Sequence, residues 1–228
     1  MEPMEPGFFG SIFEPIENLL HFLMEVLYNV TDKLGFGSYG LAIILLTIIV
    51  KVVLYPLTVK QLRSMKAMQE IQPELQKLQE KHKNNPQMLQ MKMMELYKER
   101  GVNPMAGCLP LLIQMPILMG MYYALFNFDY GGAVPSFLWL PNLSEADPTP
   151  VLPLLAAGTT LIQQKMSTMQ QTQQTKVLMI VMPLFIGWLS MTFPSGLALY
   201  WVTMNFVQIA QQWWINRYDD DSKQKGAA

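Results

Sequence analysis

The sequence of 228 residues has one cysteine, Cys108, and two histidines, His21 and His82. One cysteine excludes an internal disulfide, and these three residues do not form a recognisable set of metal ligands. Charged residues are also scarce, at 14%, whereas hydrophobic residues make up 51%. Such a composition is typical of chains in which apolar membrane spans alternate with a polar segment. We therefore expect no metal, no cofactor and no specific nucleic-acid site.

Catalytic motifs are absent as well. The sequence has no HExxH, no GxSxG and no pair of aspartates inside an apolar run, so metallo-, serine and aspartyl protease mechanisms lack their groups. A serine–lysine dyad would need a serine near Lys51, but Ser190 and Ser195 fall at the far ends of their predicted helices. There is no phosphate-binding loop either. We interpret the chain as a protein that is not an enzyme.

Five apolar stretches predict an all-α integral membrane protein with five transmembrane helices. The fourth stretch has no charged residue, Asn or Gln between positions 177 and 193, so we expect it to be a scaffold helix that faces lipid. At about 1.5 Å per residue, the first stretch reaches roughly the 30 Å of a hydrocarbon core. The stretches cover residues 39–58, 105–126, 151–167, 176–193 and 196–215.

Lysine and arginine residues are distributed unevenly between these spans. The segment 59–104 contains nine of them, and others flank the connection between the third and fourth spans or follow the fifth span. The remaining loops contain only Lys33. The positive-inside rule therefore places the N-terminus outside, and the long basic segment and the C-terminus inside.

The segment before the first span has the pattern of an amphipathic helix that lies in the outer membrane interface. Apolar residues recur with a helical period, and polar residues, three of them carboxylates, occupy the opposite face. We expect His21 to be solvated on this polar face. The apolar positions are Ile12, Ile16, Leu19 or Leu20, Leu23 and Leu27.

The basic segment is predicted to form a helical hairpin over residues 61–100. Met68, Ile71, Leu75 and Leu78 have the alternating spacing of three and four that is typical of a two-helix seam. Asn85 is expected to cap the second helix, with Pro86 in its first turn.

Methionines are concentrated in the same segment. Some must pack in the seam, but a two-helix hairpin buries only one stripe, so the others are expected to form an adaptable apolar surface that receives substrate. The alternative is that all of them simply pack or contact lipid. The proposed receiving residues are Met65, Met68, Met88, Met91 and Met94.

Lys51 is the least expected residue of the first span. A cation inside an apolar span costs about 3 kcal/mol on insertion scales, so it normally faces water, a counter-charge or a substrate path. The alternative is that its flexible stem carries the charge to the interface, although Lys60 already lies at that boundary. Spacings of four, four and three predict one helical face for Thr47, Lys51, Tyr55 and Thr58.

The other spans also contain polar residues in their inner halves, whereas the outer halves have almost none. Because such groups must be satisfied by each other or by water, we predict a hydrophilic groove that is open to the cytosol and closed to the outside. The alternative is that the amides only form hydrogen bonds between helices. The predicted groove residues are Thr47, Lys51, Gln114, Gln163, Gln164, Trp201, Asn205 and Gln208.

Four segments closely resemble the YidC family of membrane-protein insertases. The similarity extends over essentially the whole chain, from the N-terminal helix to the fifth span. The stretches GCLPLLIQMP and FPSGLALYW are its most specific parts. The segments are IIVKVVLYPLTVKQ (48–61), VNPMAGCLPLLIQMPIL (102–118), LIQQKMS (161–167) and FPSGLALYWVTMNFVQIAQQWWI (193–215).

The resemblance implies a five-span core, a cytosolic hairpin and a hydrophilic groove in the bacterial inner membrane. It also implies that the chain inserts nascent membrane proteins into lipid, alone or beside the Sec translocon, with the ribosome as a further partner. By position, the groove cation falls on Lys51, its neighbour on Thr47 and a substrate-contacting aromatic residue on Trp201. Family members usually have arginine where this chain has Lys51, so the charge is kept but the planar fork of donors is lost.

These observations together predict the organisation and the function of the chain. We expect an incoming hydrophilic segment to be drawn to Lys51 and its apolar part to leave past the first and fifth spans. The alternatives are a small ion- or proton-coupled transporter that uses Lys51, a lipid scramblase and a structural scaffold subunit. The expected parts are an extracytoplasmic segment (1–38), the first span (39–58), the hairpin (59–104), spans two to five (105–216) and a short cytosolic tail (217–228).

Overall fold

The computed structural model describes residues 8–103, 109–126, 128, 134–167 and 173–226, and it contains helices but no strand among them. This confirms the all-α prediction. A single isolated bridge joins Phe137 to Leu140. The helices are α1 (Phe8–Lys33), α2 (Tyr39–Val53), α3 (Tyr55–Glu70), α4 (Gln72–Lys81), α5 (Pro86–Glu99), α6 (Leu109–Phe126), α7 (Val151–Ser167), α8 (Gln173–Ser190) and α9 (Ser195–Gly226).

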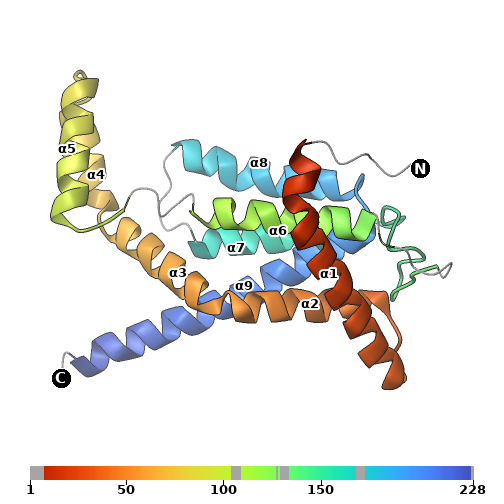
Figure 1. Ribbon diagram of the computed structural model, residues 1–228. Coiled ribbons are helices and arrows are strands. Elements are labelled where there is room, and N and C mark those ends of the chain that lie inside the picture. Colours follow the sequence, from red (N-terminus) through yellow and green to blue (C-terminus); the bar gives the residue numbers. More distant parts are fainter. Residues whose placement is uncertain (1–7, 104–108, 127, 129–133, 168–172, 227–228) are drawn as a thin grey trace.

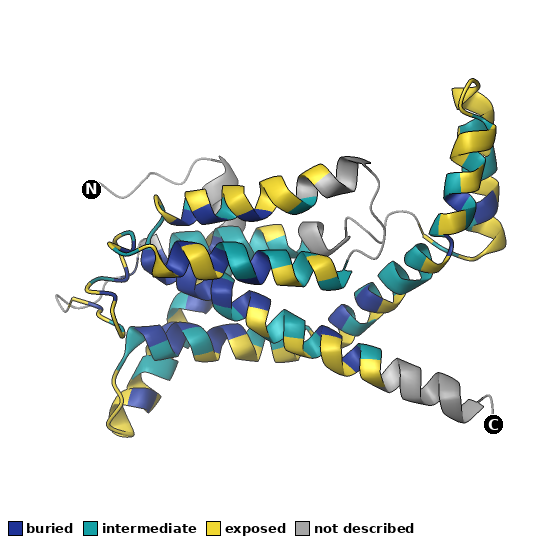
Figure 2. Cartoon of the chain, turned by 180° about the vertical axis from the view of Figure 1, so that it is seen from behind, coloured by how far each residue is buried: buried dark blue, intermediate teal, exposed yellow. Residues whose placement is uncertain are grey.

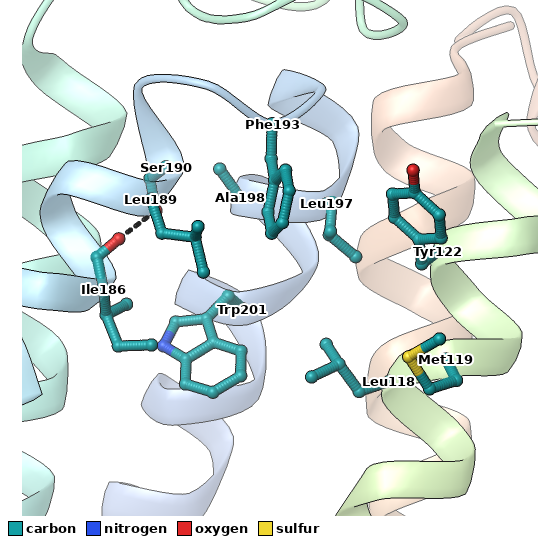
Figure 3. Close-up of a pocket in the computed structure, with 10 residues that line it drawn as sticks. All are labelled: Leu118, Met119, Tyr122, Ile186, Leu189, Ser190, Phe193, Leu197, Ala198 and Trp201. Carbon is teal, nitrogen blue, oxygen red and sulfur yellow. Dashed lines mark hydrogen bonds between the residues drawn. The ribbon is translucent and has the colours of Figure 1, made fainter.

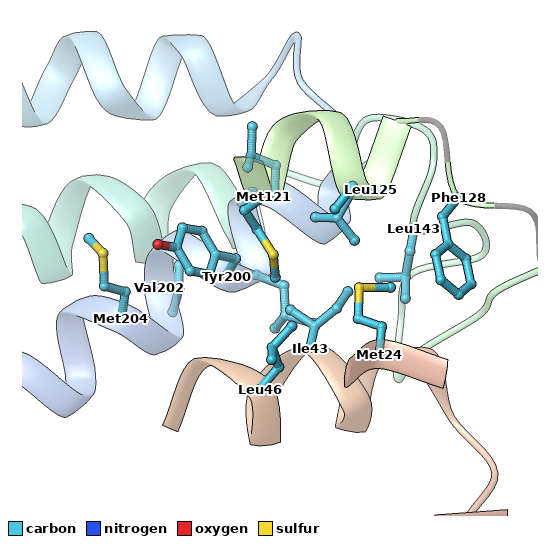
Figure 4. Packing of buried hydrophobic residues seen from close by; sticks show 14 of the residues in the cluster. Met24, Ile43, Leu46, Met121, Leu125, Phe128, Leu143, Tyr200, Val202 and Met204 are labelled. Atoms are coloured by element: carbon cyan, nitrogen blue, oxygen red, sulfur yellow. The ribbon is translucent and has the colours of Figure 1, made fainter. Parts of the chain in front are cut away.

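The body of the molecule is a bundle of α2, α6, α7, α8 and α9, which α1 crosses on one side (Figure 1). Its apolar core lies where α1, α2, α6 and α9 meet (Figure 4), with Met24, Ile43, Leu46 and Met121 almost fully buried. Figure 2 shows that the buried residues concentrate in this bundle, whereas the α4–α5 hairpin that projects from it is largely exposed.

The first predicted span is divided into two helices. Helix α2 ends at Val53, α3 begins at Tyr55, and the two meet at a bend of 65°. Pro56 in the first turn of α3 explains the break, because a proline has no N–H group to donate and its ring clashes with the preceding turn of a continuous helix. The prediction that Tyr55 and Thr58 share one helical face with Thr47 and Lys51 is therefore wrong, because the first two residues belong to α3. Thr58 nevertheless lines the same cavity as Lys51.

Length and composition distinguish this bent pair from the other helices. Among the described residues, no single helix is both long and apolar enough to cross a membrane. Helices α2 and α3 together meet both requirements, by length and composition. Two shorter apolar helical stretches are Ile113–Leu125 and Met179–Ser190.

Helix α1 packs more tightly against the bundle than the amphipathic pattern suggested. Leu20 is only 5% exposed, whereas Leu19 is 56% exposed, so Leu20 is the residue that packs inward. Gly120 of α6 permits this contact, since a Cβ at that position would lie 2.6 Å from Ile16. The prediction of a solvated His21 is wrong, because its Nε2 lies 2.7 Å from the carbonyl oxygen of Ala124 in α6.

The hairpin forms as the seam predicts, although its first helix is interrupted. Ile71 and Leu75 pack with Leu96 of α5 in a small core of their own. Asn85 caps α5 by accepting a hydrogen bond of 3.1 Å from the backbone N–H of Met88, as predicted. Helix α3 ends at Glu70, and Ile71 separates it from α4.

A loop of residues 134–150 covers the end of the bundle opposite the hairpin (Figure 1). The ring of Phe137 lies where a Cβ on Gly40 would be, so only glycine fits at this position of α2. Leu143 is buried, and its carbonyl oxygen accepts a hydrogen bond of 2.9 Å from the backbone N–H of Gly196. The loop is thereby fixed to α2 and to the start of α9.

Asp147 anchors the end of this loop to the start of α7. Its carboxylate accepts hydrogen bonds from the backbone N–H groups of Leu152 and Thr149, from the Thr149 hydroxyl and from the Trp139 indole, at 2.8 to 3.3 Å. Burial raises the pKa of Asp147, but these four donors outweigh burial and hold the pKa below its ordinary value of 3.8.

We predict that Asp147→Asn lowers the free energy of unfolding by about 1–3 kcal/mol, because the amide nitrogen replaces an oxygen that accepts buried hydrogen bonds. The wild-type contribution should be complete above pH 3.8 and should be lost as the pH falls through the lower pKa of the folded protein. Thermal unfolding in detergent, followed by circular dichroism between pH 2 and pH 7, measures both effects.

The matched control is Glu145→Gln, which changes an exposed carboxylate of the same loop that accepts from Asn142. This change should shift the free energy of unfolding by less than about 0.5 kcal/mol. Equal effects of the two substitutions would contradict the anchoring role of Asp147.

Candidate functional site

The predicted groove residues lie on α2, α6, α7 and α9. All of them except Gln164 belong to one of three polar clusters or, in the case of Thr47, to the apolar core. The first cluster surrounds Lys51. The second joins α7 to α9 in the middle of the bundle, and the third lies where α7 ends beside α3 and α9.

Lys51, in the last turn of α2, contacts α9 at two points. Its Nζ donates a hydrogen bond of 3.1 Å to Oε1 of Gln208. Its backbone carbonyl oxygen accepts a hydrogen bond of 3.1 Å from Nε2 of Gln211. No carboxylate pairs with this ammonium group among the described residues, so the partner of this half-buried cation is the neutral amide of Gln208.

A small cavity of about 30 Å³ adjoins the Lys51 side chain. Side chains of α2, α3, α6 and α9 line it, and at this size it holds one or two water molecules. This cavity by itself is too small for a peptide segment, and the open groove remains a prediction from the sequence. The lining residues are Lys51, Leu54, Leu57, Thr58, Gln61, Ile113, Gln114 and Gln208.

Gln114 reaches the same cavity from α6. Its Nε2 donates a hydrogen bond of 2.8 Å to the hydroxyl oxygen of Tyr200, which is buried in α9. The structure thus brings Gln114, Gln208 and Lys51 together, as predicted. Thr47 is different, because it is only 1% exposed and its hydroxyl donates to the carbonyl oxygen of Ile43 in its own helix. Thr47 therefore lies in the core and not at the cavity.

The second cluster consists of hydrogen bonds between α7 and α9. Asn205, which is only 4% exposed, donates from Nδ2 to the hydroxyl oxygens of Thr159 and Thr160 at 3.1 and 3.0 Å. The indole Nε1 of Trp201 donates to the same Thr160 hydroxyl oxygen at 3.1 Å. For Asn205 this geometry matches the alternative weighed above, in which amides hold helices together.

The third cluster surrounds the last turn of α7. Gln212 donates to the carbonyl oxygen of Met166 and accepts from the hydroxyl of Ser167, and Gln163 donates to that hydroxyl. Gln69 of α3 donates to the carbonyl oxygen of Ser167. Side chains from α3 and α9 therefore satisfy carbonyl groups that the end of α7 leaves free. The cluster borders a cavity of about 210 Å³ between α3, α7 and α9.

Gln164 belongs to none of these clusters. Its side-chain oxygen is buried and has no hydrogen-bond partner in the part of the chain that the structure describes.

Trp201 faces an apolar pocket of about 300 Å³ that is separate from the Lys51 cavity (Figure 3). Helices α6, α8 and α9 supply its walls. The walls are apolar apart from the polar edges of a tyrosine and of Trp201 and one serine hydroxyl, which bonds to its own helix. The lining residues are Leu118, Met119, Tyr122, Ile186, Leu189, Ser190, Phe193, Leu197, Ala198 and Trp201.

The methionines of the basic segment divide into two groups. Met68 packs against the core of the hairpin, and Met65 borders the cavity at the end of α7. Met88, Met91 and Met94 are exposed along α5 at intervals of three residues. These three residues form one surface stripe, which we call the α5 methionine stripe.

Sequence reasoning missed Gln211, Tyr200 and Ser167, which bond to the predicted residues Lys51, Gln114 and Gln163. Gln211 had a visible signal, since it lies three residues after Gln208 on the same face of α9. Tyr200 and Ser167 had none, because only the packing of different helices decides which side chains meet.

Comparison with known proteins agrees with this architecture. The family model described as 60Kd inner membrane protein matches residues 31–223. The chain is 44% identical over 203 residues to a membrane protein insertase YidC of Fusobacterium nucleatum, covering 88% of this chain and 96% of the relative. It is also 44% identical over 218 residues to the membrane protein insertase YidC of Clostridium perfringens, covering 90% and 91%.

Longer relatives and a solved structure are similar as well. The membrane protein insertase YidC of Geobacter sulfurreducens is 41% identical to this chain. The match covers 92% of this chain but only 38% of that relative. A crystal structure of an active YidC insertase with its first transmembrane domain resolved is also similar, with 31% sequence identity and a TM-score of 0.65. This match covers 90% of the present chain and 46% of the chain in that structure. From the extent of these matches, the chain belongs to the YidC family of 60Kd inner membrane proteins.

Proposed function

We propose that this chain is a membrane-protein insertase, which attracts the hydrophilic part of an incoming segment to Lys51 and releases the apolar part laterally into lipid. One observation carries the assignment: relatives named membrane protein insertase YidC are matched over 96% and 91% of their own length. This supports an insertase over the transporter, scramblase and scaffold alternatives. Its substrates are accordingly nascent membrane proteins, and its setting is an inner membrane.

The proposed orientation has the N-terminus outside and the C-terminus inside, with α2, α6, α7, α8 and α9 as the five spans. The basic hairpin and the distal half of α9 emerge from one end of the bundle, as the positive-inside rule requires (Figure 1). Trp213, Trp214 and Arg217 lie exposed near that end, where interfacial aromatic and basic residues are expected. Large apolar side chains of α8 are exposed along most of its length, which supports its role as a lipid-facing scaffold.

The first step is electrostatic. At about 4 Å and an effective dielectric constant of about 20, opposite unit charges attract by about 4 kcal/mol, so a cation at partial depth lowers the cost of bringing in a carboxylate. The cavity must widen for this step. Four residues of its lining, from Leu54 to Gln61, belong to α3 or to its junction with α2, so we propose that α3 swings about Leu54 to open the cavity to the cytosol.

The second step is lateral release, for which we propose a different exit from the one predicted from the sequence. Two hydrogen bonds at Lys51 join α2 to α9. An apolar segment that left between these helices would have to break both bonds, which makes this path unfavourable. Helices α6 and α8 instead flank the apolar pocket beside Trp201 (Figure 3). We propose that the apolar segment leaves past α6 and α8, driven by the transfer of its surface from water to lipid.

The hairpin is proposed to receive substrate before the bundle does. The α5 methionine stripe is exposed, and flexible thioether side chains adapt to unrelated apolar segments. Breaks at Leu54 and Ile71 separate the hairpin from α2, which allows it to move as a unit. The ribosome and the Sec translocon are proposed partners at this cytosolic surface.

We predict that Lys51→Ala lowers insertion of a test substrate with an acidic translocated segment by about tenfold, which corresponds to about 1.4 kcal/mol of lost attraction. Lys51→Arg should retain insertion, because it keeps the charge. The assay uses the purified chain in liposomes and measures the protease-protected fraction of a small single-span protein. Wild-type insertion of every substrate by Lys51→Ala would refute a role for the cation.

Water access distinguishes an insertase cavity from a transmembrane channel. In a Cys108→Ala background, cysteines at Gln61 and Gln114 should react with a polar maleimide added from the cytosolic side, because both residues line the Lys51 cavity. A cysteine at Leu143, a buried residue of the loop at the opposite end, should stay unreactive from either side. Labelling of the Gln114 position from the outside would contradict the proposed closure.

Replacing Met88, Met91 and Met94 together by glutamine should lower insertion several-fold without unfolding the hairpin, because all three are exposed and none is in its core. The control replaces the same three residues by leucine, which keeps an apolar stripe. Photo-crosslinking from α5 should capture substrate before crosslinking from Trp201 does. Unchanged insertion by the glutamine variant, or capture in the reverse order, would remove the receiving role from α5.

A further inference from the structure

Helix α9 binds Lys51 through both its side chain and its backbone. Gln208 and Gln211 are one turn apart on the same face of α9, and they bind the two ends of one residue. One amide accepts from the ammonium group, and the other donates to the backbone carbonyl group of the same lysine. The side chain of Lys51 is thus fixed in direction and its backbone is fixed in position.

The backbone contact has a simple cause. Lys51 lies in the last turn of α2, where carbonyl groups lose their helical partners because the chain breaks at Leu54. Gln211 therefore stabilises the end of the helix that presents the cation. Because its amide is neutral, it does so without adding a charge next to the ammonium group.

Glutamine at position 208 suits the Lys51 side chain better than a charged or an apolar residue would. An ammonium group has three donors, and Gln208 accepts from one of them, which leaves donors for a substrate. A glutamate in the same place would hold the ammonium more strongly but would neutralise it. A leucine or methionine would leave the long, flexible lysine side chain without its acceptor.

We infer that Gln208 is a specificity-determining residue that positions the Lys51 ammonium for acidic substrate segments while leaving its charge intact, and that Gln211 is a positioning residue that fixes the helix end on which Lys51 lies. This inference rests on the proposed function, since it assigns the substrate preference of the same site. An amide that only joined helices would affect the insertion of all substrates alike, whereas a specificity-determining Gln208 affects acidic substrates most.

The test compares two single-span substrates that differ only in their translocated segment, which carries two aspartates in one and two asparagines in the other. The wild-type chain, Gln208→Met and Gln208→Glu are reconstituted in liposomes, and the ratio of acidic to neutral substrate inserted is measured. Gln208→Met should lower this ratio about threefold, because the ammonium loses its fixed position. Gln208→Glu should lower it at least about tenfold, because an ion pair consumes the charge.

The matched control is Asn216→Asp, which adds one negative charge to α9 about two turns beyond Gln208, away from Lys51. This variant should keep the wild-type ratio. Thermal unfolding of each variant in detergent identifies folding defects, and if Gln208→Glu does not fold, Gln208→Met decides the question by itself.

Lys51→Ala, measured in parallel, separates the two levels of the account. If Lys51→Ala loses the preference for the acidic substrate but both Gln208 variants keep the wild-type ratio, the specificity role of Gln208 is overturned and the proposed function stands. If Lys51→Ala itself keeps the ratio, the groove cation of the proposed function fails as well. A proportional fall for both substrates in the Gln208 variants would show that Gln208 only joins helices.

Discussion

A positive charge inside an apolar helical bundle is the constraint on which the rest of this structure depends. Taking an ammonium group out of water costs several kcal/mol unless polar groups replace the solvent. In the described part of the chain, Lys51 meets this cost with the amide of Gln208 and the adjoining cavity, without a counter-charge. The charge therefore remains available to attract a carboxylate, whereas a salt bridge would have cancelled it.

The architecture around Lys51 follows from this constraint. The break at Leu54 ends α2 directly after the cation and turns α3 toward the hairpin, so that α3 forms one wall of the cavity and also carries the methionine-bearing arm. At the opposite end, the loop of residues 134–150 is fixed to α2 by the contact of Phe137 with Gly40. The bent helix pair thus leads to the hairpin at one end of the bundle, while the loop packs on α2 at the other end.

Much of this fold could be predicted from the sequence, because apolar stretches and turn residues are local signals. The third span was predicted over the same residues as α7, and the cap at Asn85 is confirmed. The division of the first span was missed, although Pro56 was visible, because a proline within a span can also be accommodated by a kink. The partner of His21 was missed for another reason, since its contact with Ala124 depends on how α1 crosses α6.

The candidate site was predictable only as a set of residues and not as an arrangement. Helical spacing indicates which residues share a face, but it does not identify the neighbour that the face meets. Asn205 and Gln208 share one stripe of α9, yet Asn205 joins α7 while Gln208 holds Lys51. Thr47 lies one turn from Lys51 and is nevertheless buried in the core.

A reciprocal exchange of charge tests the central claim most directly. The wild-type chain and Lys51→Glu are each given substrates whose translocated segments carry either two aspartates or two lysines, and the inserted fraction of each substrate is measured in liposomes. If Lys51 acts through its charge, the wild type inserts the aspartate substrate better and the variant inserts the lysine substrate better. The same order of preference in both proteins would contradict the account.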